Sequence, residues 1–258
     1  MHLVLVAQDF PPTVGGIQTY ARELAQRLAS RCERFLVVAP AHPDARACDD
    51  ALPFEVQRVG GSRDLFFAAA ALRARSFGAE ISLHTQWPSA FAALIARARG
   101  RRPRICVAAH GRELLVEPWA RVQAAQSAYD AARRSAFRHA DRVFAVSRYT
   151  AELVRAMTPA HGPLHVIGNG TDPERFRPLD ASALRAELGL GDAFVFLSVA
   201  RLVGRKGVDR VVRALAALHA PDPAPHLVIV GDGPERERLL ALVRSLGLEQ
   251  RVHFAGAV

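Results

Sequence analysis

The chain has 258 residues and half of them are apolar, so it is long enough for one large or two modest domains with a substantial core. Its three cysteines are far apart and odd in number, which argues against a disulfide framework, and no apolar run approaches the length of a signal peptide or a transmembrane helix. The net charge of +9 favours an anionic partner, but no nucleic-acid-binding module is visible. We therefore expect a cytoplasmic protein that does not bind nucleic acid.

Predicted strands and helices alternate in the first part of the chain, which is typical of parallel strands covered by helices. Short apolar runs predict strands at residues 2–8, 34–39, 54–59, 80–84, 104–109, 142–146 and 164–168. The stretches between them predict helices at residues 16–30, 63–77, 87–99, 120–139 and 147–157. Ser147 is suited to cap the last of these helices.

A turn-rich stretch after Asn169-Gly170 is followed by a short helix to about Leu188 and then by a second alternating series. This series predicts strand 194–199, helix 207–219, strand 226–230, helix 235–246 and strand 251–255. We expect an α/β protein with two units of parallel strands and covering helices, and a boundary near residues 170–190. The second has only three predicted strands, fewer than a typical open sheet, and is expected to be incomplete.

The only lysine in the chain is Lys206, since every other residue of the Lys and Arg total is arginine. A lysine retained in such a sequence favours a site where a compact charge fits better than a planar guanidinium, although a chance surface position is the alternative. Arg201 and Lys206 lie between predicted strand 194–199 and the next helix, where open α/β sheets bind ligands. Gly204 and Gly207 would let the backbone approach an anion at the helix N-terminus. The segment predicts a diphosphate site that is not a Walker loop.

Two loops of the first unit also follow the carboxyl end of a predicted strand. Gly15-Gly16 precedes the first helix and would suit a backbone that approaches an anion, although a Gly-Gly turn often only reverses the chain. His110 follows strand 104–109 and is well placed to contact a ligand, although such a histidine is more often structural. A nicotinamide enzyme is disfavoured, because there is no Gly-x-Gly-x-x-Gly and no acidic residue near position 39.

In the second unit, Gly231-Asp232-Gly233-Pro234 joins a strand to a helix. By itself this loop is typical of a tight turn, with Pro234 at the first helical position. The loop indicates a function only in combination with the other segments.

Together these segments resemble the retaining, nucleotide-sugar-dependent GT-B glycosyltransferases of family four. The matching pieces span the whole chain in order: Pro11-Pro12-x-x-Gly15-Gly16, His110-Gly111, Ala145-Val146-Ser147, Ile167-x-Asn169-Gly170-x-Asp172, Arg201-Leu202-x-x-x-Lys206-Gly207, Val230-Gly231-Asp232-Gly233-Pro234 and Phe254-x-Gly256-x-Val258. The resemblance implies a GT-B fold of two Rossmann-like domains. Residues 1–170 would form the acceptor-binding N-terminal domain, and residues 171–258 would form part of the donor-binding C-terminal domain.

The resemblance also implies catalytic roles for three residues. Arg201 and Lys206 would hold the donor diphosphate and stabilise the leaving group, and His110 would lie near the transferred sugar. Negative charge grows on the diphosphate as an oxocarbenium-like sugar forms, so fixed cations stabilise that charge.

Four further positions are implied to contact the donor. Gly15 and Gly16 would let the first helix approach its phosphates, and Gly256 and Val258 would lie near the nucleotide base. No metal or other cofactor is expected, and the sequence has no metal-ligand spacing. The implied partners are a nucleotide sugar and a glycan or lipid-linked acceptor of the cell envelope.

Peripheral contact with an anionic membrane is a further expectation. It would involve the arginine-rich stretch from Arg97 to Arg104, or a helix at 63–75 lying in the interface. A solvated helix end and burial of the helix against a sheet are the favoured alternatives.

One feature departs from the family. The Glu-x7-Glu motif of its C-terminal domain is absent, so the chain is expected to be truncated. An inactive remnant that binds only nucleotide or a partner is therefore the alternative function. A GT-B-shaped phosphorylase is excluded because it should have a second conspicuous lysine, and this chain has only Lys206. A sugar-nucleotide epimerase should bring further catalytic carboxylates. The sequence specifies neither the sugar, the base nor the acceptor.

Overall fold

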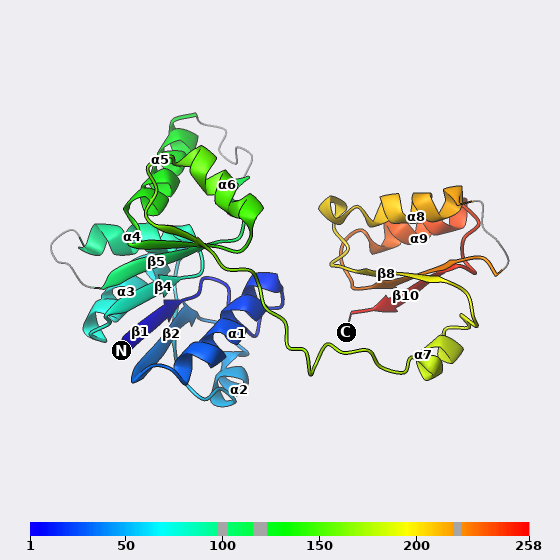
Figure 1. Cartoon of the computed structure of the whole chain (residues 1–258), viewed down its shortest axis with the longest axis horizontal. Coiled ribbons are helices and arrows are strands. Elements are labelled where there is room, and N and C mark those ends of the chain that lie inside the picture. Colours follow the sequence, from blue (N-terminus) through cyan, green and yellow to red (C-terminus); the bar gives the residue numbers. More distant parts are fainter. Residues whose placement is uncertain (98–102, 116–122, 219–222, 258) are drawn as a thin grey trace. The chain divides into compact units, whose positions relative to one another are not determined.

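The computed structural model describes residues 1–97, 103–115, 123–218 and 223–257. The chain divides into two compact units, Met1–Thr171 and Asp172–Val258, each built around its own parallel sheet (Figure 1). Each unit is described by itself below.

The sheet of the first unit has seven parallel strands in the order β3-β2-β1-β4-β5-β6-β7. They are β1 (His2–Val6), β2 (Arg34–Pro40), β3 (Glu55–Val59), β4 (Ile81–His84), β5 (Arg104–Ala109), β6 (Arg142–Ala145) and β7 (Leu164–Val166). Both ends of every strand lie within two residues of the predicted ends. The agreement is close because short buried apolar runs are clear sequence signals.

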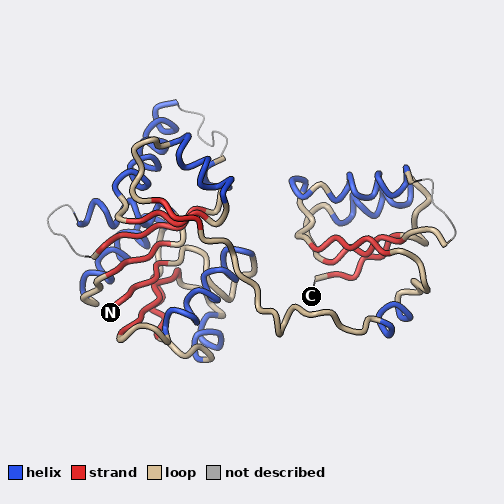
Figure 2. The backbone as a smooth tube through the Cα atoms, in the orientation of Figure 1, coloured by secondary structure: helices blue, strands red, loops and turns tan. Residues whose placement is uncertain are grey.

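Helices lie on both faces of this sheet (Figure 2). They are α1 (Gly16–Ala29), α2 (Ala45–Asp50), α3 (Arg63–Ser76), α4 (Trp87–Arg97), α5 (Gln123–His139) and α6 (Arg148–Met157), with a 3-10 turn η1 (Arg112–Leu114). Ser147 caps α6 as predicted, since its Oγ accepts a hydrogen bond from Thr150 N at 3.0 Å. The short α2 and η1 are not predicted from the sequence.

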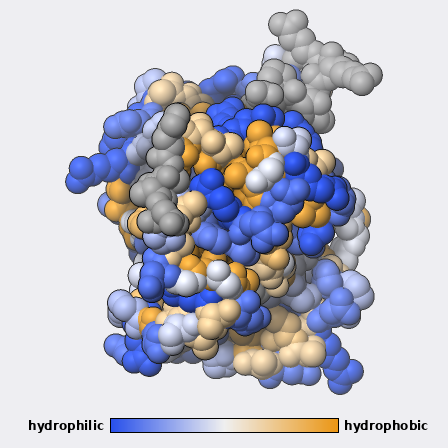
Figure 3. Space-filling view, turned by 90° about the vertical axis from the view of Figure 1, so that its right-hand side faces the viewer, coloured by the Kyte–Doolittle hydropathy of each residue, from blue (hydrophilic) through white to orange (hydrophobic). Residues whose placement is uncertain are grey.

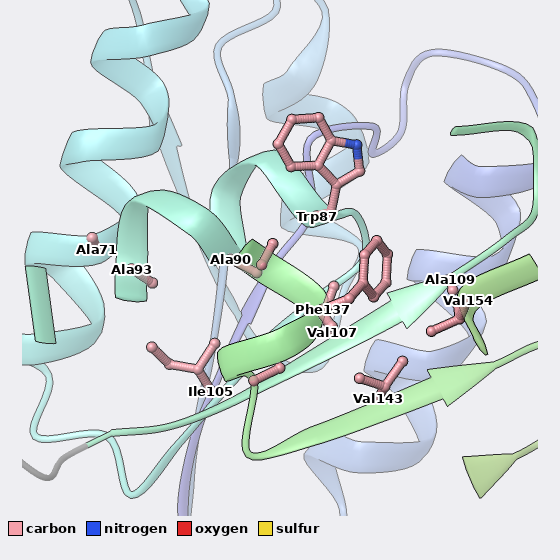
Figure 4. Packing of buried hydrophobic residues seen from close by; sticks show 12 residues of the cluster. Ala71, Trp87, Ala90, Ala93, Ile105, Val107, Ala109, Phe137, Val143 and Val154 are labelled. Atoms are coloured by element: carbon pink, nitrogen blue, oxygen red, sulfur yellow. The ribbon is translucent and has the colours of Figure 1, made fainter. Parts of the chain in front are cut away.

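Alternate residues of β1 explain why both faces need helices. Leu3 and Leu5 pack in the cluster that includes α1, whereas Val4 and Val6 pack in the cluster that includes α3. A further cluster joins α4 and α5 to β5, where Trp87, Phe137 and Val107 converge, as Figure 4 shows. A strand buried on both faces reads as a continuous apolar run, which is typical of a doubly wound parallel sheet.

The strand order reverses direction between β1 and β4, which pair side by side. Chain connections leave to opposite sides of such a point, so a crevice opens at the carboxyl ends of the two strands. In this unit the reversal point lies between the segment that follows β1 and the segment that follows β4.

The second unit is smaller. It comprises α7 (Ser182–Glu187), β8 (Val195–Val199), the 3-10 turn η2 (Gly204–Lys206), α8 (Val208–Ala217), β9 (His226–Val230), α9 (Arg236–Ser245) and β10 (Val252–Gly256). Its three strands correspond to the three predicted ones and are parallel, and the structure orders them β10-β9-β8. Leu227 and Ile229 of β9 pack with Val212 of α8 and with Leu239 and Val243 of α9.

Strand β8 exposes apolar side chains. Its register pairs Leu197 with Val228 and Val199 with Val230, so these residues point away from the face on which Leu227 and Ile229 meet the helices. Leu197 is 65% exposed and Val199 is 67% exposed. Figure 3 shows hydrophobic residues between hydrophilic ones on the face of the molecule that it draws.

Candidate functional site

In the first unit, the predicted site residues gather at the carboxyl edge of the sheet. His110 directly follows β5, Thr85 follows β4, Gly15 precedes α1, and Gly16 is the first residue of α1. The ring of His110 packs edge-on against the ring of Tyr20 in α1, with ring centroids 4.7 Å apart. The fold therefore brings His110 against the helix that begins at Gly16.

Hydrogen bonds fix the orientation of His110. Its Nε2–H donates to the carbonyl oxygen of Thr85 at 3.0 Å, and its backbone N donates to Glu113 Oε1 at 2.6 Å. No described residue bonds to Nδ1, which in this tautomer is a hydrogen-bond acceptor. Burial lowers the pKa of His110, and Glu113, Thr85 and Asp9 oppose that shift only in part. The ring is thus neutral near pH 7 and offers Nδ1 to a hydroxyl donor.

Asp9 borders the same edge of the sheet. Its Oδ2 accepts a hydrogen bond from Gln86 Nε2 at 2.7 Å, and its Oδ1 accepts one from Gln18 Nε2 at 3.4 Å. Gln86 in turn accepts a short hydrogen bond from Gln8 Nε2. These amides hold the carboxylate in place while leaving it lone pairs for a ligand.

The N-terminus of α1 is open. Gly15 occupies the cap position without a side-chain hydrogen bond, and a methyl group placed on Gly16 would meet no atom within 4 Å. Uncapped N–H groups at a helix start favour an anion. The geometry fits an anion, which is the kind of contact expected here.

In the second unit, the carboxyl ends of all three strands form one edge. Leu202 N donates to Asp232 O at 2.9 Å, which ties the loop after β8 to the loop after β9. Gly231 N donates to Gly256 O at 2.6 Å, which ties the β9 loop to the end of β10. Arg201, Lys206 and Gly256 therefore belong to a single cluster of loops. Val258 lies outside the described residues.

The glycines of the Gly231-Asp232-Gly233 loop are required by close backbone approach. A Cβ on Gly231, at φ 134°, would stand 2.0 Å from Ala200 O, and one on Gly233, at φ 155°, would stand 2.4 Å from Leu202 O. The loop is thus a packing surface for the Arg201 loop and more than a tight turn. Helix α9 begins at Arg236 with Glu235 as its cap, so the prediction of Pro234 at the first helical position is wrong.

Arg201 and Lys206 are both exposed. Lys206 is the last residue of the turn η2. Gly207 is the N-cap of α8 and supplies no side-chain hydrogen bond. Neither cation has a carboxylate partner within the described ranges, where the ion pairs of the second unit belong to Arg236 and Arg238. Two available cations beside an uncapped helix start can hold a diphosphate.

The other histidine at a strand end, His84, has a structural role. Ser89 Oγ donates to Gln86 O at 3.1 Å, so it accepts from His84 Nδ1–H at 3.0 Å, and His84 Nε2 accepts from Ser82 Oγ at 2.9 Å. Burial lowers the pKa of His84 to about 3, so the ring stays neutral. Over the residues that the structure describes, no three His, Cys, Asp or Glu side chains are grouped to hold a metal ion.

The sequence did not single out Asp9, Gln18, Gln86 or Thr85. A signal was present, because Asp9 and Gln86 are polar residues directly beyond buried apolar strands. Their relevance depends on β1 and β4 being neighbours, which only the sheet order reveals.

Family profiles cover nearly the whole chain. The profile Glycosyltransferase Family 4 matches residues 14–175, and the profile Glycosyl transferases group 1 matches residues 180–258. Their border falls close to the division between the two units at Thr171 and Asp172.

Curated relatives match along the same length. The chain is 34% identical to a GDP-mannose-dependent alpha-(1-6)-phosphatidylinositol monomannoside mannosyltransferase of Mycolicibacterium smegmatis, covering 99% of this chain and 67% of that protein. It is 35% identical to the protein of the same description from Mycobacterium tuberculosis, with the same coverage.

Solved structures confirm the predicted GT-B fold. HepE of Anabaena, crystallised with UDP, superposes with a TM-score of 0.79 at 23% identity, covering 100% of this chain and 70% of that one. Sucrose-phosphate synthase of Thermosynechococcus elongatus superposes with a TM-score of 0.74 at 22% identity, covering 99% and 70%. Because a family profile matches most of the chain and the mycobacterial relatives share about a third of its residues, the chain belongs to glycosyltransferase family 4 and is a glycosyltransferase.

Proposed function

We propose that the protein transfers a sugar from a nucleoside-diphosphate sugar to a hydroxyl group of a glycan or lipid-linked acceptor, with retention of anomeric configuration. The observation that carries the proposal is the loop cluster of the second unit. There, Arg201 and Lys206 stand unpaired among the described residues, beside the uncapped start of α8. This arrangement suits the diphosphate of a donor.

In the proposed step, the bond between the anomeric carbon and the diphosphate oxygen breaks, and its electron pair stays on the diphosphate. The acceptor oxygen bonds to the anomeric carbon on the same face, and the acceptor proton passes to the departing phosphate. Arg201 and Lys206 stabilise the negative charge that grows on the diphosphate. Cations placed beside the diphosphate before the reaction reduce the reorganisation that it requires.

His110 would act on the sugar. Its ring is held by the hydrogen bond to Thr85 O, and its Nδ1 remains available to accept a hydrogen bond. A neutral, oriented imidazole positions a sugar hydroxyl without adding a positive charge close to an oxocarbenium-like centre. The predicted contacts of Gly15 and Gly16 with the donor phosphates, and of Gly256 and Val258 with the base, remain part of the proposal. So does the expectation that no metal or other cofactor is needed.

The relatives suggest which substrates to test first. The two mycobacterial proteins are described as GDP-mannose-dependent, and their acceptor is a lipid, phosphatidylinositol monomannoside. HepE was crystallised with UDP and with UDP-glucose. GDP-mannose and a lipid-linked acceptor of the cell envelope are therefore our first choice, with UDP-glucose as the comparison.

We also propose peripheral contact with an anionic membrane on the cytoplasmic side. In α3, Leu65 and Leu72 are 61% and 64% exposed, and in the adjoining α4, Ile95 is 62% exposed. Arg63 and Arg75 of α3 are also exposed, which suits anionic head groups. The inner side of α3 is buried against the sheet, as the sequence favoured.

The prediction for the arginine-rich stretch falls largely outside the described residues, where Arg99, Arg101 and Arg102 lie. Of its described members, Arg97 pairs with Asp141. Of the described helices, none is both long and apolar enough to cross a membrane.

Lys206→Ala tests the donor site. Calorimetric titration with GDP should show affinity at least about tenfold lower than in the wild type, because a charge-assisted contact worth roughly 1.5–3 kcal/mol is lost. Lys206→Arg should restore it only in part, because the guanidinium is wider. Arg213→Ala removes another exposed cation from α8 and should leave the affinity unchanged.

Transfer of radiolabelled mannose from GDP-mannose to extracted membrane lipids completes the test. Loss of both GDP affinity and transfer in Lys206→Ala supports the proposal. Equal GDP affinity in Lys206→Ala and wild type would remove the phosphate role of this lysine. Tight GDP binding without any transfer would instead favour a protein that binds nucleotide but does not turn it over.

A further inference from the structure

The segment between β1 and α1, residues 7–15, carries two parts of the proposed site. Asp9 lies near its start, and Gly15 at its end is the N-cap of α1. Its middle contains Pro11 and Pro12, which have no backbone N–H groups and can only accept hydrogen bonds. The donors that hold this part of the segment must therefore come from elsewhere in the chain.

Arg58 of β3 supplies such a donor. Its Nη2 donates a hydrogen bond to the carbonyl oxygen of Pro11, and its Nη1 donates to the carbonyl oxygen of Pro40, the last residue of β2, at 3.0 Å. The guanidinium carbon also lies 5.5 Å from the ring centroid of Phe10. One side chain thus contacts two successive residues of the segment and the end of the neighbouring strand.

Asp49 fixes the plane of this guanidinium. Arg58 Nε donates to Asp49 Oδ2 at 2.9 Å, and Nη2 donates to Oδ1 at 2.7 Å. The two side chains are 15% and 17% exposed, so water screens the pair only weakly. A bidentate arginine–carboxylate pair sets direction as well as position, which the three donors of a lysine cannot do. The short α2, which contains Asp49, therefore directs Arg58 towards Pro11.

Phe10 connects the segment to α1 and to His110. Its ring is 3% exposed and packs in the buried cluster that includes α1. The same helix carries Gln18, which donates to Asp9, and Tyr20, whose ring packs against the ring of His110. A displacement of the segment would therefore shift the start of α1 and the groups that border His110.

Resting on the proposed function, we infer that Arg58 is a positioning residue for sugar transfer. It binds neither substrate. Its guanidinium fixes the segment between β1 and α1, and this segment presents Asp9 and the open start of α1 to the substrates. Such positioning affects the rate strongly, because a misplacement of about 1 Å can lower it about a hundredfold.

The variants Arg58→Gln and Asp49→Asn separate this role from a purely structural one. In Arg58→Gln, kcat for mannose transfer from GDP-mannose to extracted membrane lipids should fall at least about tenfold. GDP affinity should change by less than about twofold, because the proposed diphosphate cations belong to the second unit. Asp49→Asn leaves the guanidinium and its bond to Pro11 in place, so the urea midpoint should decrease while kcat falls by less than about threefold.

Hydrogen exchange of peptides covering residues 8–20 follows the segment without any need for activity, and Arg58→Gln should exchange faster there. Asp141→Asn is the matched control. It breaks the partly buried pair of Asp141 with Arg97 at the amino ends of β5 and β6, the opposite edge of the same sheet. It should lower the urea midpoint without changing kcat or the exchange of residues 8–20. If Arg58→Gln does not fold, Arg58→Lys replaces it with the same expected results, because it keeps the charge without the planar fork.

A fall in kcat at nearly constant GDP affinity, together with faster exchange of residues 8–20, supports the inference. Wild-type kcat in the Arg58 variant, or a loss no greater than in Asp49→Asn or Asp141→Asn, overturns it, because Arg58 then only stabilises the fold. Absence of transfer by the wild type counts against the proposed function. The anchoring by Arg58 is in that case decided by exchange alone, which supports it if faster in the variant and overturns it if unchanged.

Discussion

His110 illustrates how one side chain is prepared by its surroundings. Its Nε2–H is occupied by Thr85 O at 3.0 Å, and burial lowers its pKa from the ordinary value of 6.5. The group is therefore neutral at pH values where an exposed histidine would already be half protonated. A neutral ring can accept a hydrogen bond from a sugar hydroxyl at Nδ1, which a protonated ring cannot.

Replacing His110 by Ala should lower kcat by about tenfold or more while changing GDP affinity by less than about twofold, since the expected contact is with the sugar. Initial-rate kinetics and calorimetric titration on the same preparation measure the two effects. If His110→Ala keeps the wild-type kcat, the histidine is only structural.

The pH dependence of kcat provides a second test of His110. Because its pKa is lowered, the fall in rate caused by protonation should occur below pH 6.5. The Glu113 carboxylate raises the pKa of His110, so Glu113→Gln should move this fall to still lower pH while Oε1 keeps its hydrogen bond to the His110 backbone N. A fall at unchanged pH in Glu113→Gln would mean that another group is titrating.

At the scale of elements, the strand ends position the site. The loop after β8 packs directly on the loop after β9, because the glycines of the β9 loop let the two backbones approach within hydrogen-bond distance. Arg201 and Lys206 are thereby held by a neighbouring loop as well as by their own turn. The position of these cations therefore depends on Gly231 and Gly233 of the neighbouring loop.

Gly231→Ala should destabilise the second unit by about 2 kcal/mol or more, because the added Cβ would overlap Ala200 O and the backbone is strained at positive φ. GDP affinity should fall with it. Gly204→Ala is the control, since a Cβ there meets no atom within 4 Å. Urea denaturation followed by circular dichroism measures both variants, and equal stability of the two would contradict the packing role of Gly231.

His84 joins the end of β4 to the start of α4 through Ser89, and its burial makes the fold acid-sensitive. Its pKa is about 3 in the folded chain and 6.5 when unperturbed, so between these values the unfolded chain takes up a proton that the folded chain does not. Stability is therefore complete above pH 6.5 and decreases as the pH falls, by up to about 1.4 kcal/mol per pH unit from this group.

The measurement is the slope of unfolding free energy against pH for wild type and His84→Gln. Titration of all other groups is common to both proteins, so the difference in slope isolates His84. A shallower slope in His84→Gln is expected below pH 6.5. Parallel curves would mean that the buried ring is protonated in the folded state.

At the scale of the whole molecule, the two units have separate hydrophobic cores. Three buried clusters belong to the first unit, and one cluster of α8, α9 and the three-stranded sheet belongs to the second. The second unit also exposes Leu197 and Val199 of β8. A smaller core with exposed apolar surface predicts lower local stability.

Amide hydrogen exchange followed by mass spectrometry should show weaker protection after about residue 190 than before it. Leu215→Ala, in the core of the second unit, should lower stability by about 2–5 kcal/mol and speed exchange only there. Leu5→Ala is the counterpart in the first unit and should act only on that unit. Uniform changes along the whole chain in either variant would contradict separate cores.

The sequence by itself determined most of the elements, because their signals are local. Buried strands such as β5 are uninterrupted apolar runs, and α8 follows a three- and four-residue spacing. The order of motifs along the chain also determined the family, since it depends only on residue identity and spacing. The role of Lys206 was inferred from its rarity and from its place between a strand and a helix, and it still awaits the titration proposed above.

Only the tertiary structure decided which residues share a site. The strand order places β1 beside β4, so Asp9 and Gln86, which are 77 positions apart, form one hydrogen bond. A cavity of about 350 Å³ that is lined by Asp9 and Arg63 likewise requires β1, β2 and β3 to be neighbours. Such contacts have no local sequence signal, because they result from long-range strand pairing that is stabilised by burial of both faces of the sheet.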